Sequence, residues 1–298
     1  MATPSEKRYI DVPYQVGPGT HPVEIHEALH AAARSNDQPM MRTALDAGAD
    51  VNKKDQNGCT ALHHGVMGDE TVRFLLDNAA NPNIRDASGG TPLHRAARYP
   101  FKGTTETLLQ GGADPNIADR SGATPIIEVG NAENVDLLAD YGANMNARNT
   151  KGETALHVEA QHRRTAPEVM ARLAQRGVDV NATNGRGETA LHVVVEKGKQ
   201  EHLDVLLAHD ADVNAADLAG RTPLHIAAQK KNREAAFALM DKGANPNATD
   251  LAGRTPLSIN PTLINAGVEM QKGSLEQVAD QAMQGPIEVA PRRQRARL

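Results

Sequence analysis

Two histidines and a glutamate near the N-terminus have the residue types and the spacing of a zinc protease site. The stretch HEALH places His26 and His30 four residues apart, with Glu27 directly after the first histidine. On a helix, this spacing brings both imidazoles to one face, where zinc proteases use them as metal ligands and use the glutamate as a general base. A zinc-dependent hydrolase is therefore one function that these residues raise.

The composition indicates a folded, soluble protein with a thin core. The 298 residues are 39% hydrophobic and 23% charged but only 2% aromatic, and tryptophan is absent. A core of Leu, Ala, Val and Ile favours stacked helices. Cys59 is the only cysteine, which excludes an intramolecular disulfide. No apolar run approaches the roughly 20 residues of a membrane span, and no signal peptide is recognisable, so we expect a cytoplasmic protein.

A short motif recurs along the chain at intervals of 30 to 35 residues. Each copy reads Gly-x-Thr, then Ala or Pro, then Leu or Ile. The threonines are Thr60, Thr91, Thr124, Thr154, Thr189, Thr222 and Thr255. The first six copies close on an asparagine after a run such as GADPN, at Asn83, Asn116, Asn146, Asn181, Asn214 and Asn247. A period of this length is typical of repeat proteins, in which each unit packs on its neighbours.

Within one unit, the residue types predict two short helices and a hairpin-like turn. The threonine hydroxyl caps the first helix, and proline suits the first helical position. Glycine ends the second helix in the left-handed conformation, at Gly48, Gly112, Gly142, Gly177 and Gly243. Ala79 and Asp210 stand at this place in two units, where we expect a local cost in stability. The linking segment N-x-x-D/N-x-x-G has the residue types of a tight turn.

Stretches such as TPLHIAAQ, together with the period, resemble the ankyrin repeat over roughly residues 25 to 270. The resemblance implies an all-α solenoid of stacked helix-turn-helix units joined by short hairpin loops. We expect seven repeats and a degenerate eighth within residues 22–272. The sequence departs from the pattern at Ile126 and Ile127, which replace Leu-His, in a unit that is three residues short. The unit after Thr154 is two residues long.

The HEALH stretch fits the repeat when Glu27 takes the place of the threonine. His30 is then the repeat histidine, with equivalents at His63, His94, His157, His192 and His225. The resemblance implies that this histidine bonds to the neighbouring turn. One histidine per layer, about 10 Å apart, also cannot share an ion whose bonds are about 2 Å. We therefore predict a non-enzymatic protein with no metal and no cofactor, in which Cys59 is a small filler.

The two ends of the chain differ from the repeats. Residues 1–21 are rich in Pro and Gly, and we expect them to be disordered or packed on the first repeat. Residues 273–285 predict a capping helix. Residues 286–298 form a basic tail, expected to be disordered, with Arg292, Arg293, Arg295 and Arg297. It is a solvated tail, a nuclear signal, a nucleic-acid or membrane contact, or a translocation signal. The last reading would make the chain a bacterial effector that enters a host cell.

The expected partner is another protein, on the concave surface of hairpins and first helices, and the chain would act as a scaffold, adaptor or inhibitor. The motif DLAGRT occurs twice and puts Leu218 with Arg221, and Leu251 with Arg254, at hairpin tips. Two leucines at successive tips predict an exposed apolar patch, unless each folds back on the neighbouring hairpin.

A second candidate surface is the ridge of turns between the helices. Its residues are Tyr99, Phe101, Lys102, His162, Arg163, Arg164, Lys197, Lys199, Lys230, Lys231 and Arg233. This ridge could face an acidic protein or a phosphate backbone, or it could be a solvated face. The net charge of −5 and the shortage of aromatic residues weigh against nucleic acid. We expect no small-molecule substrate.

Overall fold

The computed structural model of the chain consists of helices, turns and hairpin loops. It describes residues 21–100, 102–162, 166–265 and 269, and no strand occurs within these ranges. The chain divides into two compact units, residues 1–190 (unit 1) and 191–298 (unit 2), each described by itself below. The predicted all-α class is confirmed. The predicted capping helix, the basic tail and nearly all of the N-terminal extension lie outside the described residues.

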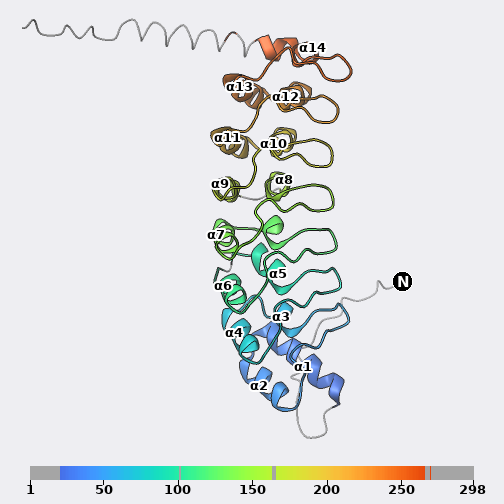
Figure 1. The fold of residues 1–298 in the computed structure, drawn as a ribbon, viewed down its shortest axis with the longest axis vertical. Helices are drawn as coiled ribbons and strands as arrows, with labels where there is room; N and C mark the ends of the chain where they lie inside the picture. Colours follow the sequence, from blue (N-terminus) through green and yellow to red (C-terminus); the bar gives the residue numbers. More distant parts are fainter. Residues whose placement is uncertain (1–20, 101, 163–165, 266–268, 270–298) are drawn as a thin grey trace, which may run out of the picture. The chain divides into compact units, whose positions relative to one another are not determined.

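Unit 1 contains five pairs of helices in its described part. The pairs are α1 (Pro22–Ser35) with α2 (Gln38–Asp46), α3 (Ala61–His64) with α4 (Asp69–Asp77), α5 (Pro92–Arg98) with α6 (Lys102–Gln110), the 3₁₀ helix η1 (Pro125–Glu128) with α7 (Ala132–Asp140), and α8 (Ala155–Gln161) with α9 (Pro167–Gln175). First helices pack on first helices and second helices on second helices. The hairpin loops all leave from the side of the first helices (Figure 1).

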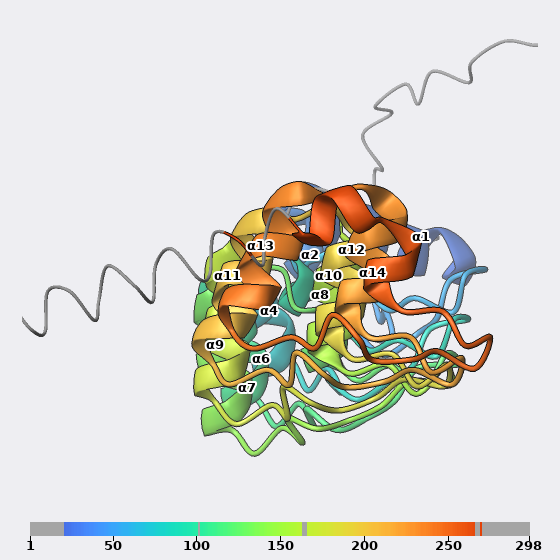
Figure 2. The same ribbon diagram turned by 90° about the horizontal axis from the view of Figure 1, so that it is seen from above.

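Unit 2 repeats the same arrangement. Its helices are α10 (Ala190–Lys197), which starts at the boundary, α11 (Gln200–Ala208), α12 (Pro223–Lys230), α13 (Arg233–Asp241) and α14 (Pro256–Ile259). α12 packs on α13 and on α14, which has the place of a first helix in the next layer. Within this unit too, the hairpin loops lie on one side of the helices (Figure 2).

The core of each layer is thin, because small residues fill it. The leucine of the repeated motif is fully buried, as at Leu62, Leu93 and Leu156. Alanines such as Ala96 and Ala97 follow it on the same helix and let neighbouring helices approach closely. Burying a leucine stabilises a fold by about 1.5–3 kcal/mol. The near absence of aromatic residues is therefore matched by a core built mainly from leucines and alanines.

The repeat histidine joins each layer to the next hairpin. The Nε2–H of His63 donates to the carbonyl oxygen of Gly90 at 3.2 Å, while its Nδ1 accepts the amide N–H of Thr60 at 3.1 Å. A carbonyl needs a donor and an amide needs an acceptor, so the two partners require a neutral ring with its proton on Nε2. Burial also lowers the pKa of His63, to about 4.

The other repeat histidines make the same bond to the following hairpin. Their Nε2 atoms lie 2.8 to 3.0 Å from backbone carbonyl oxygens, in the pairs His30–Lys53, His94–Ala123, His157–Glu188, His192–Arg221 and His225–Arg254. Burial lowers the pKa of His30 and of His157 as well. The histidines are thus links between layers.

Asparagines make a second set of bonds between layers, at the ends of the second helices. Asn83 Nδ2 donates to the carbonyl oxygen of Gly112 at 3.0 Å, and its Oδ1 accepts the amide of Asp114 at 2.8 Å. Equivalent pairs of bonds are made by Asn52, Asn116, Asn146 and Asn214. The closing asparagine of the sequence motif therefore fastens its layer to the next one.

The layer that starts at Thr124 is irregular. A 3₁₀ helix replaces the expected α-helix, and it is followed almost at once by Asn131, the N-cap of α7. Ile127 stands at the position of the repeat histidine and cannot bond to Thr124, whose hydroxyl is buried with no hydrogen-bond partner. Because this layer has no repeat histidine, it lacks the bonds that the histidine makes to the threonine and to the next hairpin in the other layers. Its turn is also three residues shorter.

We predict that replacement of His63 by Gln weakens the fold and its pH dependence. Loss of the links to Gly90 and Thr60 should cost about 1–3 kcal/mol of unfolding free energy at pH 7.5. The native pKa of His63 is depressed, so its stabilising contribution is complete above about pH 6.5 and is lost as the pH falls towards 4. Urea unfolding at pH 7.5 and at pH 5 measures both effects. The exposed turn residue His162, changed to Gln, is the control; equal effects of the two changes would contradict the link.

Candidate functional site

Each hairpin is closed by the side chain of an aspartate or an asparagine. Asp86 shows the pattern: its Oδ1 accepts the amide N–H of Ser88 at 2.9 Å and that of Gly90 at 3.1 Å. The equivalent residues are Asp55, Asp119, Asn149, Asn184, Asp217 and Asp250. One oxygen of each side chain is therefore used by the turn, and the remaining polar atom can act elsewhere.

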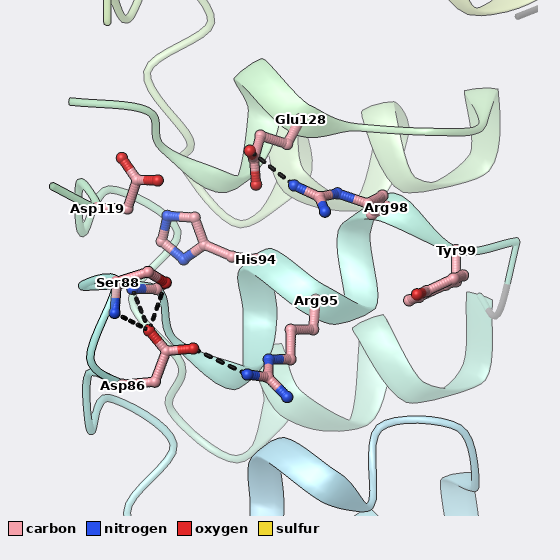
Figure 3. A pocket seen from close by; sticks show the side chains of 9 residues that line it. Asp86, Ser88, His94, Arg95, Arg98, Tyr99, Asp119 and Glu128 are labelled. Atoms are coloured by element: carbon pink, nitrogen blue, oxygen red, sulfur yellow. Dashed lines mark hydrogen bonds and ion pairs between the residues drawn. The ribbon is translucent and has the colours of Figure 1, made fainter. Parts of the chain in front are cut away.

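A pocket of about 500 Å³ lies in unit 1 between two successive hairpins and the first helices beside them. Its charged residues are Asp86, Arg95, Arg98, Asp119 and Glu128; Ser88, Gly90, His94 and Tyr99 complete the lining. Figure 3 shows that the side chains come from both hairpins, from α5 and from η1. The pocket lies on the side of the first helices and hairpins, where the sequence predicted a partner.

Two ion pairs fix the walls of this pocket. Arg95 lies 2.9 Å from the Oδ2 of Asp86, and Arg98 lies 2.7 Å from the Oε1 of Glu128 in the next layer (Figure 3). Burial raises the pKa of Asp86, but the hydrogen bonds of Ser88 and Arg95 outweigh it and lower the pKa to about 2. Asp86 is therefore charged throughout the neutral range, and its charge is used within the protein.

Tyr99 is held at the end of the pocket by the irregular layer. It ends α5, and its carbonyl oxygen accepts N–H groups from Asn131 at 2.8 Å and from Asn134 at 3.0 Å. Its side chain is 43% exposed. The sequence predicted Tyr99 as part of the ridge of turns, and the structure shows that it also lines the pocket.

The hairpin tips of unit 2 carry the two leucines predicted from the repeated DLAGRT motif. Leu218 is 72% exposed and Leu251 is 81% exposed, so neither side chain folds back on a neighbouring hairpin. The amide of Leu251 donates to the carbonyl oxygen of Ala219 at 3.0 Å, which holds the two tips side by side. The tips therefore present two adjacent apolar side chains to solvent.

The two arginines of the same motif have a structural role. Arg221 lies 2.7 Å from the Oδ2 of Asp217, and Arg254 lies 2.7 Å from that of Asp250. Burial raises the pKa of each aspartate, but hydrogen bonds from its arginine and from the turn amides lower it overall. Each arginine thus braces its own hairpin, so the leucines are flanked by neutralised ion pairs and not by free positive charge.

The basic ridge is partly neutralised as well. Lys230 lies 3.9 Å from Glu196, and the guanidinium of Arg233 stacks 5.0 Å from the ring centre of Phe237. Lys231 ends α12 in the left-handed conformation and is exposed. Phe101, Arg163 and Arg164 lie outside the described residues, so their part in the ridge remains a prediction.

The histidines of HEALH both bond to the hairpin that follows α2. His26 Nδ1 accepts the amide of Asp50 at 3.2 Å, and His30 Nε2 donates to the carbonyl oxygen of Lys53 at 2.9 Å. α1 begins at Pro22, six residues before Ala28, where the repeat register predicts the first helical residue. One ring nitrogen of each histidine is thereby used by the fold.

Sequence reasoning missed a polar cluster around Cys59. Donor atoms of Asp55, Cys59 and His64 lie within 4.8 Å of one another, a spacing that a metal ion could use. The cluster fits a cation poorly, because Arg95 donates to Cys59 Sγ at 3.0 Å and Arg34 lies 3.4 Å from His64 Nδ1. Burial also raises the pKa of the Cys59 thiol. Cys59 is therefore part of a hydrogen-bonded cluster and more than the filler that we predicted.

Comparison with known proteins identifies the family. A family model described as ankyrin repeats (3 copies) matches residues 29–119, 93–184, 125–217 and 159–250, which together cover most of the chain. The chain belongs to the ankyrin-repeat family, and its repeats indicate a protein–protein interaction module. No described helix is long and apolar enough to cross a membrane.

Two individual proteins show how far the similarity extends. The human SH3 and multiple ankyrin repeat domains protein 2 is 28% identical over 134 residues, which are 44% of this chain and 6% of that protein. The crystal structure of the human ASB11 ankyrin repeat domain superposes with a TM-score of 0.64 at 24% identity, covering 73% of this chain and 98% of that one. The second likeness shows the fold.

We predict that Asp86 and Asp119, at equivalent hairpin positions, respond differently to replacement by Asn. Asp86→Asn keeps the turn bonds but leaves Arg95 without its carboxylate, which should cost about 1–2 kcal/mol. Asp119→Asn removes no ion pair and should change stability by less than about 0.5 kcal/mol. The depressed pKa of Asp86 means that its contribution is complete above about pH 4 and is lost as the pH falls towards 2.

Urea unfolding of the two variants and the unchanged chain, at pH 7 and at pH 3, measures these differences. The gap between the unchanged chain and Asp86→Asn should narrow at the lower pH. Equal losses of stability in both variants at pH 7 would show that the Asp86–Arg95 ion pair has no energetic effect.

Proposed function

We propose that the chain works by binding another protein through the hairpin tips of unit 2, as a scaffold, an adaptor or an inhibitor. One observation carries this proposal. Leu218 and Leu251 are the most exposed large apolar side chains in the described part of the chain, and they occupy the same position in consecutive hairpins. A leucine at such a tip has no core of its own to enter, and a partner can bury it.

The surroundings of the leucines suit an interface. An apolar centre with a polar rim is the usual anatomy of a protein–protein contact, and the ion pairs of Arg221 and Arg254 provide the rim. These pairs and the turn bonds also hold the hairpins rigid before a partner arrives, so that little conformational freedom is lost on binding. Burying each leucine would contribute about 1.5–3 kcal/mol.

The other functions raised by the sequence have less support. Catalysis by HEALH would need His26 and His30 free, and each has a ring nitrogen in a bond to the following hairpin. Nucleic-acid binding would need an uncompensated basic ridge, and Lys230 and Arg233 are engaged with Glu196 and Phe237. Delivery of the chain into a host cell by the basic tail stays a prediction from the sequence alone.

Affinity capture with a paired variant tests the proposal. The full chain and its Leu218→Ser/Leu251→Ser variant would be used as baits, and a protein captured by the first would be purified and titrated against both. Loss of two buried leucines should weaken the affinity at least about tenfold. Because the contact is apolar at its centre, raising the salt concentration should change the affinity of the unchanged chain little.

Tyr141→Ser is the matched control, because Tyr141 is also a large exposed side chain but ends α7, a second helix of unit 1. This variant should bind the partner as the unchanged chain does, and all three proteins should unfold at the same urea concentration. Equal affinity of the leucine variant and the unchanged chain would place the interface elsewhere and overturn the proposal.

A further inference from the structure

The aspartate that closes a hairpin pairs through its second carboxylate oxygen with a histidine or an arginine, where one is in reach. Asp55 Oδ2 lies 2.9 Å from His64 Nε2, and Asp86 Oδ2 lies 2.9 Å from Arg95. The two hairpin aspartates of unit 2 pair in the same way with the arginines four residues on. Pairing is therefore the rule at this position of the fold.

Asp119 departs from the rule. Its Oδ1 accepts the amide and hydroxyl of Ser121 at 2.8 and 2.7 Å and the amide of Ala123 at 2.9 Å. No ion pair reaches Asp119 from any described residue. The reason lies in the sequence: Ala123 stands where the unit 2 hairpins have arginine, and Glu128 stands on η1 where α5 has Arg95.

The unpaired carboxylate lines the pocket of about 500 Å³ described above. The other four charged side chains of that pocket form two pairs, Asp86 with Arg95 and Arg98 with Glu128. The lining therefore holds one negative charge that the described part of the protein does not neutralise. Figure 3 shows Asp119 near the hairpins, with Glu128 and Arg98 along the same wall and Tyr99 at the far end.

We propose that this pocket receives the cationic end of an arginine or lysine side chain presented by a protein partner. Asp119 would supply the ion pair that its own layer lacks, in a recess already walled by fixed ion pairs. The volume is sufficient for a long side chain and its stem. The proposal rests on the interaction function but not on the leucine tips of unit 2.

Two other hairpins of this chain show that asparagine can replace the aspartate at this position, which allows the charge of Asp119 to be removed alone. Asn149 and Asn184 occupy the same hairpin position and make the same turn bonds through Oδ1, to amides two and four residues on. Asp119→Asn should therefore keep the hairpin intact while removing the charge. Asp114→Asn is the matched control, because Asp114 is exposed, lies outside the pocket lining, and accepts the amide two residues on, as Asn144 does at the equivalent place in the next layer.

Peptide selection tests the proposal without knowledge of the natural partner. Peptides would be selected from a random library against the full chain, synthesised, and titrated by fluorescence anisotropy. We expect peptides with a common arginine or lysine, whose replacement by norleucine weakens binding at least about tenfold. Asp119→Asn should bind the parent peptide more weakly by the same factor. It should bind the norleucine peptide no more weakly than the unchanged chain does. Asp114→Asn should bind the parent peptide as the unchanged chain does.

Several results would overturn the proposal. The first is the absence of any selected peptide with a required basic residue. The second is equal binding by Asp119→Asn and the unchanged chain, and the third is an equal loss of binding in Asp114→Asn. A tenfold gain in peptide affinity on deletion of residues 286–298 would show that the chain's own arginines take the place assigned to a partner. If only the Leu218→Ser/Leu251→Ser variant loses the selected peptides, the proposed function stands and this inference fails.

Discussion

The bond from the repeat histidine to the next hairpin is the constraint on which the rest of the structure depends. Its geometry needs a neutral ring: Nδ1 accepts the amide of the threonine three residues earlier, and Nε2–H donates to a carbonyl oxygen in the following layer, as at His63 and His225. A stack of thin layers has no deep core to set its spacing. A buried polar bond in each layer does this instead, because an unpaired ring nitrogen there would be costly.

The hydrogen-bonded repeat, called the frame below, divides the residues of each layer into those that hold the stack together and those that are free to vary. Threonine, histidine, leucine and the closing asparagine serve the stack, and their places vary little within the chain. The hairpin tips and the exposed faces of the first helices are free to change. The features that suggest recognition are departures from the frame: leucines at two tips, and a layer in which Ile127 and Glu128 replace the usual residues. That layer has a 3₁₀ helix, an orphaned Thr124 hydroxyl and the unpaired Asp119.

The sequence predicted the frame well, because each frame residue acts through a local rule or a fixed spacing. The motif placed the first helices, the left-handed ends at Ala79 and Asp210, and the exposed leucine tips. It could not show that Arg221 would pair with Asp217, because that bond depends on the turn conformation and both residues look equally exposed in the sequence. The pocket around Asp119 was missed for a similar reason. Its charges come from two hairpins and two first helices, and only their pairing reveals which charge is left over.

The most direct test of the central physical claim is the protonation state of the repeat histidines, measured by ¹⁵N NMR of the side chains between pH 7.5 and pH 5. The geometry requires that the repeat histidines with both ring nitrogens bonded, such as His63, are neutral at pH 7 and carry their proton on Nε2. Burial lowers the pKa of His63 to about 4 and also lowers that of His157, so these two rings should stay neutral at pH values below the usual pKa of a histidine. A proton on Nδ1, or a charged ring at pH 7, would contradict the account, because neither state can make the bonds that join the layers.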